Sequence, residues 1–409
     1  MTSSTDPQTP DTGTAAVARP RLVTRALLLR FVTVIGASAS FFLLLSVVPL
    51  YAKESSGGGS NAAGLATGAL MLATVAGELI TPRFVGRYGY RVSLAVGLVL
   101  LGAPALVLTA FDGMVWIVAV CLLRGFGFAL TVVAGGALTV SLIPPERRGE
   151  GLAVAGIVAG VPSLVGLPAG VWLATHIGYT TVAVTGAVVA LAAIVVVPGL
   201  PAREPTPDRP LGIVAGFRTP GLLRPTLVFA TTALGAGIVV TFLPLAVPST
   251  YTGLVAVALF VQPAASTAAR WAAGRHGDRH GPAGLVVPGL LASAAGILVT
   301  ALTGNPVAVV AGVALFGIGF GVAQNATITL MYARVTASGY GTVSALWNFA
   351  YDAGMGVGAV GFGALAAPVG YPRAFALTAL LMLIAFLPAW RDRAADRAAA
   401  RPDETTQQG

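Results

Sequence analysis

Three charged residues lie inside long apolar stretches of the sequence, where an ionised group is costly. They are Glu78, Arg124 and Asp352. A medium of low dielectric disfavours the charged form of a carboxyl group, so a buried acid can take up and release a proton. Asp352 lies near the middle of its apolar stretch and is the best candidate for a proton-carrying group.

Each of these charges also has a structural interpretation. Arg124 could take part in coupling or contact a substrate, or it could be a permanent ion-pair partner of Asp352, which lies at comparable depth. Glu78 precedes Arg83 by about one helical turn and could pair with it, or it could relay protons to Asp352. Asn348, one turn before Asp352 on the same helical face, could orient the carboxyl group.

The composition of the chain excludes an ordinary soluble protein. Of 409 residues, 56% are hydrophobic and 10% are charged, with a mean hydropathy of +0.85, whereas soluble proteins carry about 25% charged residues. The net charge of +9 does not indicate nucleic-acid binding, because the arginines are scattered singly between apolar runs. The expected partner of so apolar a chain is therefore a lipid bilayer.

Twelve apolar runs are each long enough to cross a bilayer, which takes about 20 residues. They predict an all-α membrane protein of twelve transmembrane helices in two pseudo-symmetric six-helix bundles, residues 25–199 and 226–390. A linker at 200–225 joins the bundles, and tails at 1–24, expected to be disordered, and 391–409 flank them. The runs lie near 27–51, 63–82, 92–111, 115–142, 152–174, 180–199, 226–247, 252–273, 284–303, 306–332, 342–366 and 373–390.

The basic residues predict the orientation of this chain. All of the 24 Lys and Arg residues except Lys53, Arg124 and Arg373 fall on the side of the N-terminus. Basic residues are retained in the cytoplasm, so we expect a multi-pass plasma (inner) membrane protein with both termini cytoplasmic. The halves also resemble each other at an offset of about 192 residues, which indicates a duplicated bundle.

Glycine-rich motifs are the most specific local signals. The segment Gly274-Arg-His-Gly-Asp278-Arg279-His-Gly281 has a first-half counterpart around Arg87 and Gly89, in which Pro82 and Gly86 replace the first Gly and the Asp. In the fourth run Arg124 is followed by Gly125 and Gly127. The fifth run is rich in Gly and Pro, which allow close packing and bend a helix. Its motif residues are Gly160, Pro162, Gly166, Pro168 and Gly170.

These motifs resemble those of the major facilitator superfamily, and the fifth run is most similar to that of the twelve-span drug:proton antiporter group. The resemblance implies that the loop and fifth-run residues act as a conformational latch and hinge. It also implies a substrate cavity lined by the first, fourth, seventh and tenth runs, with further contacts from the eleventh. The candidate substrate-binding residues are Phe128, Phe242, Phe320, Gln324, Asn325, Trp347, Asn348 and Tyr351, and Phe41 is a further cavity candidate.

The resemblance implies a secondary transporter rather than an enzyme. No phosphate-binding Walker loop is present, and we expect no cofactor and no metal site. The leading hypothesis is proton-coupled efflux of small, largely apolar molecules by a monomer, with protons and a small-molecule substrate as its partners. The alternatives are a facilitator or symporter that imports a nutrient such as a sugar, and a membrane receptor or scaffold that transports nothing.

Overall fold

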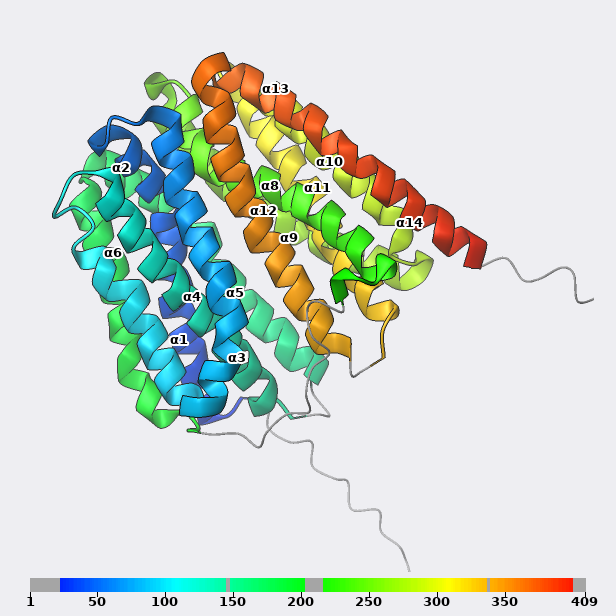
Figure 1. Ribbon diagram of the computed structural model, residues 1–409, viewed down its shortest axis with the longest axis horizontal. Coiled ribbons are helices and arrows are strands. Elements are labelled where there is room, and N and C mark those ends of the chain that lie inside the picture. Colours follow the sequence, from blue (N-terminus) through cyan, green and yellow to red (C-terminus); the bar gives the residue numbers. More distant parts are fainter. Residues whose placement is uncertain (1–22, 145–147, 203–215, 337–338, 400–409) are drawn as a thin grey trace, which may run out of the picture.

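A computed structural model of the protein describes residues 23–144, 148–202, 216–336 and 339–399. Every regular element in these ranges is helical (Figure 1). Most of the predicted N-terminal tail and much of the predicted linker lie outside the described residues, as does the end of the predicted C-terminal tail.

The N-terminal half forms one bundle, blue to green in Figure 1. The short helix α2 follows α1 after Ser46, and the two together make the first span. A 3-10 segment, Ala193–Gly199, continues α6. The helices are α1 Arg25–Leu45, α2 Val47–Ser55, α3 Gly59–Leu106, α4 Met114–Leu142, α5 Arg148–His176 and α6 Tyr179–Ala192.

The C-terminal half forms the second bundle, green to red in Figure 1. Short 3-10 segments at Ser249–Tyr251 and Leu383–Ala385 interrupt it. The helices are α8 Pro220–Ala246, α9 Thr252–His280, α10 Ala283–Thr300, α11 Pro306–Ala333, α12 Tyr340–Val369, α13 Tyr371–Met382 and α14 Phe386–Ala399.

Eleven helical segments in the described part of the chain are long and apolar enough to cross a membrane. One of them, α3, has 48 residues and turns at Gly89, whose φ of 79° and ψ of 175° are not helical. At 1.5 Å per residue α3 is about 70 Å long, twice the thickness of a bilayer. It therefore supplies two spans, and the predicted twelve-span, all-helical fold is confirmed.

The two halves have glycines with positive φ at equivalent positions. Gly89 and Gly281 have φ angles of 79° and 80°, and Gly178 and Gly370 have 106° and 78°. Both pairs keep the offset of about 192 residues that the sequence repeat predicts. Only glycine adopts positive φ at little cost, so these glycines end a helix or start one at equivalent places in both bundles.

Helices α3 and α12 bring the halves together along a seam of small residues. A Cβ atom at Gly64 would lie 2.5 Å from the carbonyl oxygen of Ala359, and one at Gly363 would lie 2.8 Å from that of Ser60. The Ser60 hydroxyl donates to the Gly363 carbonyl at 3.0 Å. These contacts lie where α3 begins and α12 ends, and the two ribbons diverge toward the opposite end (Figure 1). We call this end of the interface the closed end.

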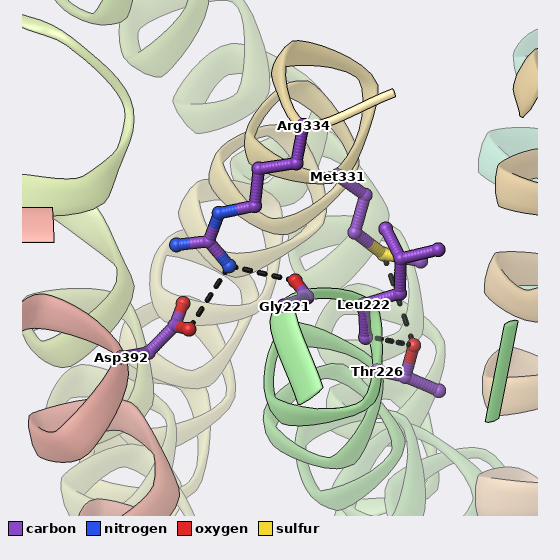
Figure 2. Close-up of polar contacts among 6 residues, drawn as sticks. All are labelled: Gly221, Leu222, Thr226, Met331, Arg334 and Asp392. Atoms are coloured by element: carbon purple, nitrogen blue, oxygen red, sulfur yellow. Dashed lines mark hydrogen bonds and ion pairs between the residues drawn. The ribbon is translucent and has the colours of Figure 1, made fainter. Parts of the chain in front are cut away.

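Polar contacts tie the C-terminal bundle together near the end of α11 (Figure 2). The Nη1 atom of Arg334 donates to the carbonyl of Gly221 at 2.7 Å and to Asp392 at 2.9 Å. Thr226 on α8 donates to the Leu222 carbonyl. These contacts join α8, α11 and α14.

Candidate functional site

Glu78 and Asp352 meet across the interface between the halves. They follow the small-residue seam along α3 and α12, and their carboxyl groups are hydrogen-bonding neighbours. Asp352 is buried, with 6% of its surface exposed. A hydrogen bond between two carboxyl groups requires at least one proton, so this pair is a place where the protein can hold a proton.

Arg124 and Asp352 do not form an ion pair, although both are described residues. The Nε and Nη2 atoms of Arg124 donate to the carbonyls of Leu101 and Ser40, each at 3.1 Å. The interpretation of Arg124 as the permanent partner of Asp352 is therefore wrong for this conformation, because backbone carbonyls of α3 and α1 already satisfy the guanidinium. Arg124 also lines a small cavity with Cys121 of α4.

A second arginine, Arg30, is buried in the N-terminal bundle, with 4% of its surface exposed. The orientation count placed it among the cytoplasmic residues, but it lies within α1 and binds α4. Its Nε atom donates to the Gly135 carbonyl at 3.0 Å and to the Thr139 hydroxyl at 3.2 Å, and Nη1 donates to Thr33 at 2.7 Å. These acceptors explain why the interior tolerates the charge.

An aromatic cluster lies in the C-terminal half beside the carboxyl pair. The ring of Phe229, which is fully buried, stacks on Trp347 at 4.4 Å between centroids and lies 6.1 Å from Phe320 and 6.2 Å from Tyr351. Three predicted substrate-binding residues, Trp347, Phe320 and Tyr351, are thus brought together. The seventh run contributes Phe229 to this cluster, and not Phe242, which was the predicted substrate-binding residue of that run.

Arg270 joins this cluster and was missed as a site residue. It donates a hydrogen bond to the side-chain oxygen of Gln324, a predicted substrate-binding residue one helical turn from Phe320 on α11. The orientation count treated Arg270 as cytoplasmic, but α9 extends to His280 and places Arg270 within a span. The predicted eighth run, 252–273, already contained Arg270, and this was the signal that the orientation count overlooked.

Other predicted substrate-binding residues lie elsewhere. Phe128 stacks on Phe41 at 3.6 Å within the N-terminal half. Phe242 is fully buried against Phe362 at 4.7 Å, in the core near the closed end, and does not face a substrate in this conformation.

Two polar candidates also stand apart from the carboxyl pair. Asn325 lies beside α9, since a Cβ atom at Gly274 would be 3.4 Å from its amide nitrogen. Among the described side chains Asp352 bonds Glu78 and not Asn348, so the predicted orienting contact from Asn348 is absent.

The Gly/Pro-rich motif of the fifth run has two distinct parts. Gly166 and Gly170 pack on α1, with a Cβ at Gly166 only 3.0 Å from that of Phe42. At Gly160 no atom lies within 4 Å of the position that a Cβ atom would occupy, so the close helix contact expected there is missing. Pro162 and Pro168 both lie inside α5.

The glycine-rich segment from Gly274 to Gly281, expected to be a loop between two helices, is largely helical. Residues from Gly274 to His280 belong to α9, and Gly281 ends the helix with its positive φ. Arg279 is exposed, and the side chain of Asp278 lies outside the described residues. In the first-half copy, Arg87 lies over the ring of Tyr88 at 5.5 Å. The latch role of these residues therefore stays a prediction.

Comparison with known proteins is consistent with this geometry. The sequence profile of the Major Facilitator Superfamily matches residues 30–359 and 226–408. Among solved structures, the nucleoside transporter NupG superposes with a TM-score of 0.70 at 12% identity, over 90% of this chain and 99% of that one.

Two further solved structures are similar. The peptide transporter POT in complex with sulfate gives a TM-score of 0.74 at 15% identity, covering 91% of this chain and 94% of that one. A bacterial homolog of the human lysosomal transporter Spinster, in an inward-facing and unoccupied conformation, gives 0.70 at 15% identity, over 92% and 98%. At these identities the likeness establishes the shared fold.

Proposed function

The chain belongs to the Major Facilitator Superfamily, and on that premise we propose that it is a proton-coupled exporter of small, largely apolar molecules. It is a multi-span secondary transporter, and its family is not enzymatic. The proposal adds the coupling ion, the direction and the substrate class to what membership establishes.

The observation that carries the proposal is the meeting of Glu78 and Asp352 across the seam. A shared proton lets the two carboxyl groups hold α3 and α12 together. When that proton leaves, two negative charges face each other in a medium of low dielectric and repel. Protonation of this pair would therefore bias the equilibrium between the two ends of the transporter, which is what coupling requires.

The direction of transport is supported by the fifth run. Its Gly/Pro-rich motif resembles that of drug:proton antiporters, and Gly166 and Gly170 pack closely on α1. The substrate class is supported by the half-buried rings of Trp347 and Tyr351, which stack on the buried ring of Phe229 and offer a flat apolar surface. With both termini in the cytoplasm, the closed end would face the outside.

The test is substrate-induced proton movement in proteoliposomes under an imposed pH gradient, with a panel of hydrophobic drugs and sugars. We expect drugs to trigger proton flux in the wild type and in Asp112→Asn, a matched control at an acid outside the pair that accepts a hydrogen bond from Tyr51. Asp352→Asn and Glu78→Gln should abolish the flux.

Two other results would change the assignment. Indifference of transport to the pH gradient would reject proton coupling. Uncoupled sugar exchange that survives in Asp352→Asn would make the protein a facilitator and would leave Asp352 with a structural role.

A further inference from the structure

We propose that the substrate carries a carboxylate and that Arg270 binds it. The inference rests on the proposed function in one respect: it takes the substrate to occupy the region between the two halves. It concerns binding and not coupling, so it can hold or fail independently of proton transport.

The side chain of Arg270 reaches a buried residue of a neighbouring helix. It donates a hydrogen bond to Gln324 of α11, which is buried with 4% of its surface exposed. Arg270 itself is exposed, so its guanidinium is held by α11 on one side and stays open on the other. This combination is expected of a cation that faces a solvent-accessible site inside a bundle.

Arg270 differs from the two buried arginines of the described structure, Arg30 and Arg124. Carbonyl and hydroxyl oxygens of their own bundle bind several donors of those side chains. Arg270 has one hydrogen-bond acceptor among the described residues, the amide oxygen of Gln324. A guanidinium has five N–H donors and binds a carboxylate through two of them, so Arg270 retains donors for a ligand.

No described acid neutralises Arg270. Asp352, the next residue after Tyr351, hydrogen-bonds with Glu78 on the other side of the interface. Elsewhere in the described part of the chain, Asp392 pairs with Arg334. A cation within a span is stable only with a partner or with water. A ligand carboxylate would supply that partner.

The internal repeat shows where the ligand would bind. At the offset of about 192 residues, Arg270 of α9 corresponds to Glu78 of α3, and Gly160 of α5 corresponds to Asp352 of α12. Helices α5 and α9 pack together as α3 and α12 do. The interface of α3 and α12 therefore pairs two acids. In the equivalent interface of α5 and α9, a cation takes the place of one acid and a glycine that of the other, and no atom lies within 4 Å of the position that a Cβ atom of this glycine would occupy. The missing side chain leaves room for an anion from outside.

The surrounding groups define the rest of the ligand. Trp347 stacks on Phe229, and its indole nitrogen is buried without an acceptor in the described structure. Indole and guanidinium groups are donors only. The site therefore fits an organic acid whose planar apolar body lies against the rings and whose oxygens accept from Arg270 and Trp347.

The experiment compares matched acids and amides on the purified full chain in detergent. Thermal unfolding is followed with 2-naphthoate, indole-3-acetate and salicylate, each beside its neutral carboxamide. We expect the acids to raise the unfolding temperature of the wild type more than the amides do. In Arg270→Gln the apparent affinity for the acids should fall about ten-fold or more, as for the loss of one charged hydrogen bond, and Arg270→Lys should retain part of it.

The control variant is Arg275→Gln, because Arg275 lies on the same helix over the ring of Trp271. It should keep the preference for acids, and so should Asp352→Asn, in which coupling is removed. Equal stabilisation by acids and amides in the wild type would overturn the proposal, as would a preference for acids that survives in Arg270→Gln.

Discussion

Burial of charge is the main problem that single residues solve in this protein. Arg30 and Arg124 are nearly inaccessible, with 4% and 2% of their surfaces exposed. Both donate to backbone carbonyls of neighbouring helices, which remain acceptors even when they take part in helical bonds because each oxygen has two lone pairs. The N-terminal bundle therefore accommodates two cations with no buried acid beside them among the residues that the structure describes.

Gly135 makes the Arg30 site possible, and its substitution gives a first prediction. A Cβ atom at Gly135 would overlap Nη2 of Arg30, so Gly135→Ala should displace the guanidinium and lose its bonds to α4. We expect a loss of about 1 to 3 kcal/mol of stability, measured as a lower unfolding temperature in detergent. Gly136→Ala is the control, because no atom lies within 4 Å of its built Cβ. Equal effects of the two variants would contradict the assignment.

The sequence identified some of the charged residues but not their partners. Glu78, Arg124 and Asp352 were recognisable because each interrupts an apolar run. Hydropathy gives the depth of a residue but not the direction in which it points around the helix axis. The contact between Glu78 and Asp352 was therefore one of several possibilities, and Arg270 was assigned to the wrong environment.

At the scale of elements, helices in this protein end where glycine permits a turn. Gly281 ends α9 with φ of 80° and ψ of 149°, and alanine there would adopt a positive-φ, extended conformation that costs about 1 to 3 kcal/mol. We predict that Gly281→Ala lowers stability by this amount in thermal or denaturant unfolding. Gly284→Ala, at a helical glycine with open space, should be neutral. A neutral Gly281→Ala would mean that the turn is not required.

The seam between α3 and α12 gives the next prediction. A Cβ at Gly64 would meet the backbone oxygen of Ala359 at 2.5 Å, and backbone cannot rotate away as a side chain can. Gly64→Ala should therefore push the helices apart at the closed end. In a protein lacking Cys121, a cysteine at Ser60 should become more reactive to a hydrophilic maleimide.

Gly86→Ala on the same helix is the matched control for this experiment, because its built Cβ meets no atom within 4 Å. It should leave the labelling rate unchanged. Unchanged labelling in Gly64→Ala would show that the seam tolerates a methyl group and that close packing there is not essential.

Hydropathy predicted the number of spans because each apolar run matches the thickness of a bilayer. It did not predict how far helices continue beyond the membrane, since charged residues such as Arg275 and Arg279 are good helix formers in water. The loop signature was therefore expected between helices but belongs largely to α9. The helix ends at Gly281, the last glycine of this segment.

For the whole molecule, the arrangement of two similar bundles follows from the internal repeat, but the state of the interface does not. Which end is closed depends on contacts between residues of different halves. A glycine or a threonine in the sequence does not indicate that its partner lies some 170 positions away. The repeat also hides an asymmetry, because equivalent positions carry Glu78 in one half and Arg270 in the other.

Thr67 and Thr241 provide a test of whether the halves must separate at the closed end. Their hydroxyl oxygens lie 2.9 Å apart, joining α3 to α8 across the halves, so cysteines at both positions are close enough to form a disulfide. In a background without Cys121, oxidation of Thr67→Cys/Thr241→Cys should abolish transport, and a reducing agent should restore it. The reason is that alternating access requires this end to open once in each cycle.

The matched control for this experiment joins two residues of one half. The hydroxyls of Thr109 and Thr180 lie 3.0 Å apart, both within the N-terminal bundle. Oxidised Thr109→Cys/Thr180→Cys should transport at the rate of its reduced form, because the bundle moves as one body. Full transport by the oxidised Thr67→Cys/Thr241→Cys protein would mean that the closed end stays shut throughout the cycle, and the two-bundle mechanism would have to be rejected for this chain.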